Sequence, residues 1–213
     1  MEKLRVSEIF YSLQGETTRM GLPTVFIRLT GCPLRCVYCD TQYAFTGGKM
    51  MSIPEILDKV SNSKARYVTV TGGEPLAQKA CLSLLAALCD AHYSVSIETS
   101  GAFDISEIDP RVSRIVDIKT PGSGEVSKNL FENLALISSK DEIKFVLCDR
   151  EDYQWALQIM NDYQLAQVCP ILFSPTYGQL AADLLAKWIL EDHAPVRLQL
   201  QLHKILWGEV AGR

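Results

Sequence analysis

Short apolar runs rich in β-branched residues alternate along this chain with stretches of helical periodicity. Such alternation is typical of β/α units and predicts an α/β fold with a mainly parallel sheet. The expected strands cover residues 24–29, 67–71, 93–98, 114–119, 142–147, 168–173 and 196–202. The expected helices begin near Ser52, where Ser52-Ile53-Pro54-Glu55 forms a capping box, and then cover 78–91, 129–137, 151–163 and 180–189.

Polar residues keep alternate positions in five of these strands, although strands of a filled parallel barrel are nearly all apolar. The polar positions are Arg28 and Thr30; Thr69 and Thr71; Ser94, Ser96 and Glu98; Asp117 and Lys119; and Arg197, Gln199, Gln201 and His203. The residues between them, such as Val68, Val95 and Leu198, form the face expected to pack under helices. One such strand would suit a half-solvated sheet, but five favour a polar interior that holds a ligand. We therefore expect a partial, open parallel (β/α)6-type barrel.

Residues of types suited to catalysis or ligand binding gather at or just after the ends of the expected strands. They are Cys32, the segment Thr71-Gly72-Gly73-Glu74-Pro75, Glu98-Thr99, Lys119-Thr120, Ser174-Pro175 and His203-Lys204. In barrel-like α/β folds the carboxyl ends of the strands form the active face. This clustering indicates an enzyme.

Length and composition limit the remaining possibilities. The 213 residues are 47% hydrophobic and 22% charged, with no linker-like stretch, so we expect a single domain over residues 1–213. The formal net charge of −4 and the lack of a basic run argue against a nucleic-acid partner. No leader-like or membrane-length apolar stretch occurs, so we expect a cytoplasmic protein with no membrane partner.

The chain has seven cysteines, an odd number that does not suit a disulfide framework. Cys81, Cys89 and Cys169 lie in apolar stretches and are expected to be buried thiols, and we favour a packing role for Cys148 as well.

Cys32, Cys36 and Cys39 form a C-x3-C-x2-C pattern on one short loop. A closed zinc site wants four protein ligands, so three thiolates indicate a metal centre with one open position. Thiolates also suit an iron–sulfur cluster, whose free iron can bind a small molecule. The alternative is a zinc knuckle that takes a fourth ligand such as Asp40 or a distant cysteine, but no second ligand pair is visible.

This pattern, with Tyr38 before its last cysteine, resembles the signature of the radical S-adenosylmethionine (SAM) superfamily. The resemblance implies a [4Fe-4S] cluster on Cys32, Cys36 and Cys39, with SAM on the fourth iron, in a partial barrel of the radical SAM kind. Gly72-Gly73-Glu74-Pro75 would by itself indicate only a tight turn. Here it resembles the GGE motif of the superfamily, which implies that Gly73 and Glu74 bind the methionine end of SAM.

Three further segments are similar to the family of 7-carboxy-7-deazaguanine synthases. They are the LQGE segment within Tyr11-Ser12-Leu13-Gln14-Gly15-Glu16, the pair Asp40-Thr41 after the third cysteine, and Gln199-Leu200-Gln201-Leu202-His203-Lys204. Together with Arg28 and the GGEP segment, the resemblance extends over nearly the whole chain. Departures are Thr17 where many relatives have Gly, Asp117-Ile118-Lys119 where some have Ser-Pro-Lys, and Ser174-Pro175 in place of Gln-Pro.

The resemblance implies a radical SAM lyase of queuosine and 7-deazapurine biosynthesis. It converts 6-carboxy-5,6,7,8-tetrahydropterin to 7-carboxy-7-deazaguanine and ammonia by a Mg²⁺-dependent radical ring contraction, with SAM regenerated. It also implies an electron donor such as a flavodoxin and a homodimer.

The same resemblance assigns site residues. Substrate contacts are expected from Leu13, Gln14, Gly15, Arg28 and Thr71. SAM contacts are expected from Tyr38, Cys39, Asp40, Gly73, Glu74, Glu98, Lys119, Ser174, Pro175, Thr176 and Tyr177. Thr41 is expected to bind Mg²⁺, which accepts few protein ligands, although its hydroxyl could instead cap the loop. Glu16 and His203 are candidate acid–base groups, and His203 could equally be a satisfied histidine at a strand end.

Two other functions remain open at this point. A radical SAM activase that makes a glycyl radical on a partner protein shares the cysteine spacing, but the LQGE segment and Arg28 favour a small polar substrate. A metal-stabilised binding module without activity would hold zinc instead of an iron–sulfur cluster.

Overall fold

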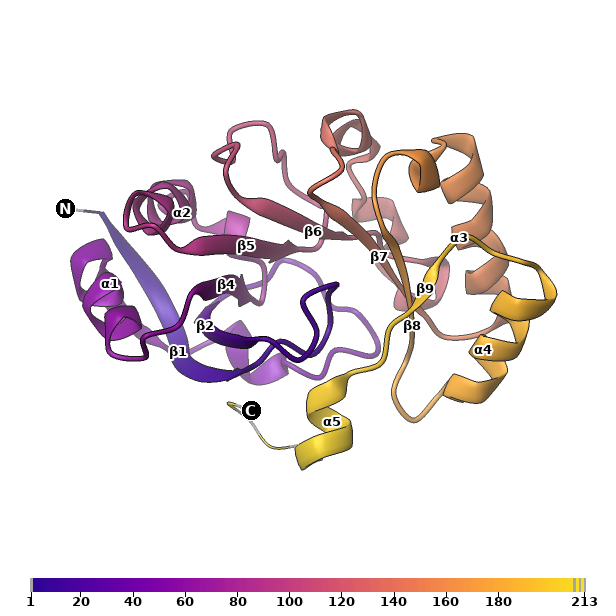
Figure 1. Ribbon diagram of the computed structural model, residues 1–213, viewed down its shortest axis with the longest axis horizontal. Helices are drawn as coiled ribbons and strands as arrows, with labels where there is room; N and C mark the ends of the chain where they lie inside the picture. Colours follow the sequence, from indigo (N-terminus) through magenta and orange to yellow (C-terminus); the bar gives the residue numbers. More distant parts are fainter. Residues whose placement is uncertain (1, 209, 211, 213) are drawn as a thin grey trace.

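The computed structural model describes residues 2–208, 210 and 212 of the chain. The expected single domain, 1–213, includes positions 1, 209, 211 and 213, which lie outside the described residues. One nine-stranded sheet runs through the fold in the order β3-β1-β2-β4-β5-β6-β7-β8-β9. Helices α1 to α4 lie along the outer side of this curved sheet, and α5 lies apart from them beyond β9 (Figure 1).

The strands are β1 (Lys3–Leu13), β2 (Pro23–Leu29), β3 (Lys49–Ser52), β4 (Tyr67–Gly72), β5 (Ser94–Thr99), β6 (Ser113–Asp117), β7 (Glu142–Leu147), β8 (Ile171–Pro175) and β9 (Arg197–Leu198). The α-helices are α1 (Ile53–Ser61), α2 (Cys81–Asp90), α3 (Arg150–Asp162), α4 (Ala182–Glu191) and α5 (Leu202–Trp207). Short 3-10 helices are η1 (Gln42–Phe45), η2 (Pro75–Ala77), η3 (Pro121–Ser123), η4 (Val126–Lys128), η5 (Phe131–Leu136) and η6 (Leu165–Gln167).

From β2 to β9 every neighbouring pair of strands is parallel, as βα repeats require. β1 lies between β2 and the edge strand β3, and it pairs antiparallel with both. β3 and β9 do not pair with each other, so the sheet stays open. This confirms the expected α/β class with a partial, open parallel barrel.

The alternation along the strands separates two faces as predicted. On the outer face Val68, Val70 and Ile97 are fully buried in the core below the helices. On the inner face the hydroxyls of Thr69 and Ser96 hydrogen-bond to each other at 2.9 Å. The polar residues are therefore paired within the barrel and are not exposed to bulk solvent.

The β1–β2 connection, residues 14–22, enters this polar interior. The Gln14 amide donates to Thr69 Oγ1 at 3.3 Å, Thr18 donates to the Glu142 carboxylate, and the Arg19 guanidinium donates to Ser113 Oγ at 3.0 Å. These contacts bind the connection to three different strands of the barrel, β4, β6 and β7. An open barrel is thus closed partly by its own N-terminal hairpin.

The structure corrects several sequence-based elements. β1 and β3 were not expected, and within residues 129–137, where an α-helix was predicted, the structure has only the 3-10 helix η5 (Phe131–Leu136). The Asn133 side chain explains the second difference, because it accepts from Ile105 N and donates to the carbonyls of Gly101 and Phe103. Those long-range bonds tie the segment to the chain after β5, so a regular helix does not propagate.

The predicted last strand, 196–202, is wrong beyond its first residues. β9 pairs Arg197 and Leu198 with β8, and Gln199 N still donates to Phe173 O at 2.8 Å. The chain then turns, because Leu202 N donates to Gly15 O at 3.1 Å and α5 begins. Leu198 is 36% exposed, so this strand does not present the covered apolar face that the alternation predicted.

None of the helices in the described part of the chain has the length and apolarity that a membrane crossing requires.

The outer core can be tested at its aromatic centre. Phe145 is fully buried and packs edge-on against Phe173 and Trp155. Phe145→Ala is expected to lower the free energy of unfolding by about 3–5 kcal/mol because it leaves a cavity in a close-packed core. Urea unfolding of the reduced protein measures this, with Tyr163→Ala as control, since Tyr163 is 44% exposed. Equal midpoints for the two variants would contradict the assignment of this core.

Candidate functional site

A cavity of about 740 Å³ lies on the polar side of the barrel. Every predicted site residue except Glu74 lines it: Leu13, Gln14, Gly15, Glu16, Arg28, Cys32, Cys36, Tyr38, Cys39, Asp40, Thr41, Thr71, Gly73, Glu98, Lys119, Ser174, Pro175, Thr176, Tyr177 and His203. Segments far apart in the sequence thus meet in one place, as the positions at the strand ends predicted. Which ligand each of them contacts stays a prediction.

The cysteine loop is anchored by backbone bonds and by one buried side chain. Gly31 N donates to Ala44 O, and Glu74 N donates to Gly31 O, both at 2.8 Å. Leu34 is 2% exposed and points inward, while Arg35 folds back to donate to Cys32 O at 2.7 Å. These contacts hold the loop against the ends of the neighbouring strands.

The two glycines after β4 allow the loop to sit this close. A Cβ on Gly73 would lie 2.3 Å from Gly31 O and 2.8 Å from Cys32 Cβ, and one on Gly72 would lie 2.5 Å from Leu29 O. Any side chain would displace the loop, so the Gly-Gly pair is a packing requirement as well as a turn.

The three loop thiols are free and half-buried at the cavity wall. Burial raises the pKa of Cys36 to about 11 and also raises that of Cys32, although the Lys119 ammonium opposes both shifts. Among residues 2–208, 210 and 212, no three His, Cys, Asp or Glu side chains converge on a point where they could bind one metal ion. Thiolates of a [4Fe-4S] cluster bind different irons and need not converge, so three soft donors around a cavity fit such a cluster.

Glu74 is the exception among the predicted residues. Its side chain is fully buried, and its carboxylate accepts from Leu76 N, Thr99 Oγ1, Ser100 N and Ser100 Oγ at 2.5–2.9 Å. These four donors leave no carboxylate oxygen at the cavity wall. In this structure Glu74 ties the end of β4 to the end of β5, and its expected contact with SAM stays a prediction.

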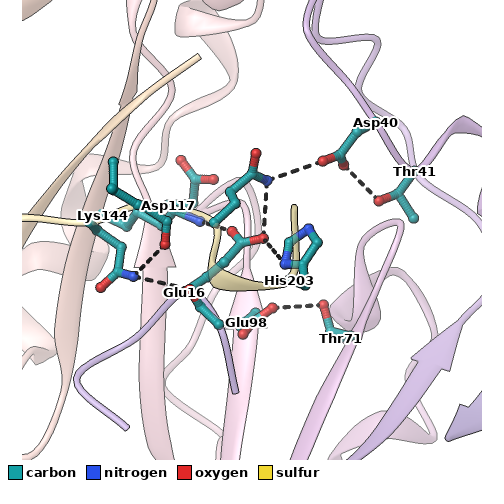
Figure 2. A network of polar contacts seen from close by, with 12 residues as sticks. Glu16, Asp40, Thr41, Thr71, Glu98, Asp117, Lys144 and His203 are labelled. Atoms are coloured by element: carbon teal, nitrogen blue, oxygen red, sulfur yellow. Dashed lines mark hydrogen bonds and ion pairs between the residues drawn. The ribbon is translucent and has the colours of Figure 1, made fainter. Parts of the chain in front are cut away.

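Gln14 and Thr71 hold Glu98 at the inner end of the cavity. The Gln14 amide donates to Glu98 Oε1 at 3.1 Å, and the Thr71 hydroxyl donates to Oε2 at 3.0 Å (Figure 2). Burial and the nearby charge of Glu16 raise the pKa of Glu98, against the opposing effects of Lys144 and the two hydrogen bonds. Glu98 is thus a candidate proton carrier beside the predicted substrate contacts.

Arg28 lines the cavity on β2, next to Thr71 on β4. Its Nε donates to Glu8 Oε1 at 2.8 Å, its guanidinium lies over the rings of Phe10 and Tyr43, and its side chain is 16% exposed. The salt bridge and the rings hold the guanidinium in place. Its two terminal nitrogens make no hydrogen bond to the described residues, so they can still present a fork to an anionic ligand.

Lys119 and Asp117 form an ion pair of 2.9 Å beside Tyr38. Burial alone would lower the pKa of Lys119, but Asp117 and Cys36 outweigh it and raise the pKa to about 12. Within the described part of the chain, Tyr38 OH and Asp117 Oδ1 are buried and have no hydrogen-bond partner. Such atoms require a partner, so this wall is suited to a polar ligand.

Asp40 connects the cysteine loop to the C-terminal segment. Lys204 binds its Oδ2 at 2.9 Å, and Gln201 donates to the same oxygen at 3.1 Å. Thr41 Oγ1 donates to Oδ1 at 2.9 Å (Figure 2). Partial burial opposes ionisation, but these partners lower the pKa of Asp40 to about 2. The hydroxyl of Thr41 is therefore oriented by Asp40 at the cavity wall.

The chain after β8 completes the wall near Lys204. Ser174 and Thr176 are buried, and Thr176 N donates to Leu147 O at 2.8 Å. Tyr177 is 59% exposed, and the Lys204 ammonium lies 4.5 Å from the centre of its ring. Tyr177 is thus at the rim, whereas Ser174 and Thr176 belong to the interior.

His203 lies in the first turn of α5 and not at a strand end, which corrects its predicted setting. Its Nδ1 is 3.7 Å from Glu16 Oε1, and Gly15 packs directly against it. The segment after β9 therefore covers the LQGE segment.

Lining residues that were given no predicted role include Lys144 on β7, Gln201 just before α5 and Lys204 within α5. For Lys144 a signal existed, because Glu142 and Lys144 alternate with buried Ile143 and Phe145 as in the other strands. For Gln201 and Lys204 the chain reversal after β9 decides their place, and no local pattern predicts it.

The close approach at Gly73 can be tested directly. Gly73→Ala is expected to destabilise the protein by about 1–3 kcal/mol, because backbone must move, and to reduce the iron bound after reconstitution. Thermal unfolding and iron analysis measure the two effects. Gly47→Ala is the control: Gly47 also needs its positive φ of 79°, but a Cβ there meets nothing within 4 Å, so iron binding should persist. Normal iron content and stability in Gly73→Ala would contradict the steric argument.

Known proteins resemble the chain in sequence and in fold. Residues 26–117 match the radical SAM superfamily. The 7-carboxy-7-deazaguanine synthase of Chlorobaculum tepidum is 46% identical over 96% of this chain and 94% of its own length, and that of Koribacter versatilis is 40% identical over 96% and 97%. The crystal structure of QueE from Escherichia coli superposes with a TM-score of 0.77 at 24% identity, covering 93% of this chain and 94% of that one. The chain therefore belongs to the family of 7-carboxy-7-deazaguanine synthases, within the radical SAM superfamily.

Proposed function

We propose that this chain is a radical SAM lyase that converts 6-carboxy-5,6,7,8-tetrahydropterin to 7-carboxy-7-deazaguanine and ammonia in the biosynthesis of queuosine and related 7-deazapurines. The observation that carries the proposal is one cavity in which three loop thiols face a polar wall of Gln14, Arg28 and Thr71. Relatives with this name align over nearly the whole chain, and the site lies in the aligned region. A glycyl-radical activase is not favoured, because this wall suits a small polar molecule.

In this proposal Cys32, Cys36 and Cys39 hold the [4Fe-4S] cluster, and SAM lies between Tyr38, Asp40, Gly73, Lys119 and the segment Ser174–Tyr177. Cluster and SAM together supply a 5′-deoxyadenosyl radical when electrons arrive from a donor such as a flavodoxin. The buried Tyr38 hydroxyl and Asp117 carboxylate oxygen are available to a polar ligand on this wall.

The chain's own residues would bind and orient the pterin. The Arg28 guanidinium is held by Glu8 and presents its free fork to the substrate carboxylate. Leu13, Gln14, Gly15 and Thr71 hold the ring system opposite the cysteine loop. Glu98 has a raised pKa and lies between Gln14 and Thr71, so it joins Glu16 and His203 as a candidate to accept or donate a proton.

A Mg²⁺ site at Thr41 is also part of the proposal. Mg²⁺ prefers hard oxygen ligands and accepts substrate or water oxygens in most of its shell. The Thr41 hydroxyl donates a hydrogen bond to Asp40, so the lone pairs of the Thr41 oxygen are free for a cation. We further propose a single domain over residues 1–213, a homodimer and a cytoplasmic location.

Anaerobic reconstitution with iron, sulfide and Mg²⁺, followed by SAM, reductant and the pterin, tests the function. We expect 7-carboxy-7-deazaguanine and ammonia, with 5′-deoxyadenosine far below the amount of product because SAM is regenerated. Cys36→Ala, which lacks one proposed ligand of the cluster, is the control and should give no product. An intact cluster without product would refute the assignment. Activity on a partner polypeptide alone would instead support the alternative function of a glycyl-radical activase.

The role of Arg28 is tested by its conservative replacement. Arg28→Lys keeps the charge but loses the fork, so KM for the pterin is expected to rise roughly 10- to 100-fold with a smaller change in kcat. A tetrahydropterin without the 6-carboxylate should bind equally weakly to both proteins. If Arg28→Lys weakened this analogue as well, Arg28 would act on another part of the substrate.

A further inference from the structure

Lys144 is a buried cation of the cavity to which the proposed function gives no role. It lies on the inner strand β7, between the fully buried Ile143 and Phe145, and its own side chain points to the polar side and is 10% exposed. Its ammonium binds the Glu16 carboxylate through Oε2 (Figure 2). Glu16 directly follows Gln14 and Gly15, the proposed substrate contacts.

The Glu16 carboxylate is held from two sides. Opposite Lys144, Gln201 donates to its Oε1 at 3.1 Å, and His203 Nδ1 lies 3.7 Å away. The backbone of the loop is fixed too, because Gly15 N and Glu16 N both donate to Gln14 Oε1, at 2.8 and 2.9 Å. This carboxylate therefore has a defined position at the cavity wall.

The charges around Glu16 require a cation at this point. Asp40 on the cysteine loop and Glu98 on β5 repel it, while Lys144 on β7 and His203 on α5 attract it. Burial would raise the pKa of Glu16, but Lys144 and His203 outweigh burial and Asp40, and the pKa is lowered. Among the cavity-lining carboxylates of the described residues, Asp40 and Asp117 have their own lysines, so Lys144 is the lysine left for Glu16 and Glu98, with His203 also near Glu16 and Arg28 near Glu98.

Stability is a weak reason for this arrangement. A buried ion pair contributes little to stability compared with well-packed apolar residues, because both charges lose their water. A pair of this kind at a cavity wall is better explained by a ligand that needs the carboxylate.

We propose that Lys144 is a positioning residue: it holds the Glu16 carboxylate, charged and in place, where that carboxylate accepts hydrogen bonds from N–H groups of the bound pterin. An ionised carboxylate has no proton to donate, so it acts only as a hydrogen-bond acceptor. The rings of a tetrahydropterin carry several N–H donors that it can accept from. The proposal rests on the proposed substrate. Lys144 does not itself touch the substrate.

Equilibrium binding of 6-carboxytetrahydropterin to the holoenzyme with SAM, in the absence of reductant, tests this role without turnover. Lys144→Met and Glu16→Gln should each weaken binding about 10- to 100-fold, since each removes a charge-assisted contact. Lys144→Arg should recover most of the affinity. In the Glu16→Gln background, Lys144→Met should cause little further loss, and the double variant, with neither charge buried, also controls for folding.

Lys140→Met is the matched control. Lys140 precedes the same strand, but its ammonium donates to the carbonyls of Pro110 and Val112, away from the cavity. It should bind the pterin like the wild type.

Three results would overturn the role of Lys144. These are unchanged binding in Lys144→Met, losses from Lys144→Met and Glu16→Gln that multiply in the double variant, and no recovery with Lys144→Arg. Failure of the wild-type holoenzyme to bind the pterin would instead remove the proposed function and, with it, the substrate on which this role depends.

Discussion

The site depends on one close contact between two stretches of backbone. The end of β4 and the cysteine loop approach so tightly that a Cβ on Gly73 would overlap Gly31 O. Two hydrogen bonds, from Gly73 N to Leu29 O and from Glu74 N to Gly31 O, close the contact. Since Glu74 also binds Thr99 and Ser100, the same contact sets the position of β5. The start of the cysteine loop, the glycine pair and the end of β5 are therefore joined by one set of hydrogen bonds.

The second organising factor is charge. Four acidic side chains (Glu16, Asp40, Glu98, Asp117) and four cationic ones (Arg28, Lys119, Lys144, Lys204) line the cavity in the described part of the chain. Each acid except Glu98 has a cation in direct contact. Unpaired charges are costly in a site of low dielectric, and pairing keeps the carboxylates ionised there. Glu98, which has no cation in direct contact among the described residues, has a raised pKa and therefore holds a proton more readily than an ordinary glutamate.

Much of the barrel could be predicted because its strands have a strict two-residue period. Val68 and Thr69 lie on opposite faces in the structure, as the pattern requires, and helix α1 begins where Glu55 accepts from Ser52 N. Prediction failed where long-range contacts override local preference. Asn133 binds the chain after β5 and replaces a helix by η5, and the contact of Leu202 with Gly15 ends the last strand early.

The sequence by itself determined the class of fold, the cysteine loop and the family resemblance. These rest on local spacing and periodicity, which a single chain displays without being folded. Only the tertiary structure decided which side of each motif faces the cavity. It buried Glu74 under four donors, placed His203 on α5 beside Glu16, and brought Lys144 to the same carboxylate. The reason is physical: those contacts join residues more than a hundred positions apart in two cases, and they form only when the barrel closes around its own N-terminal hairpin.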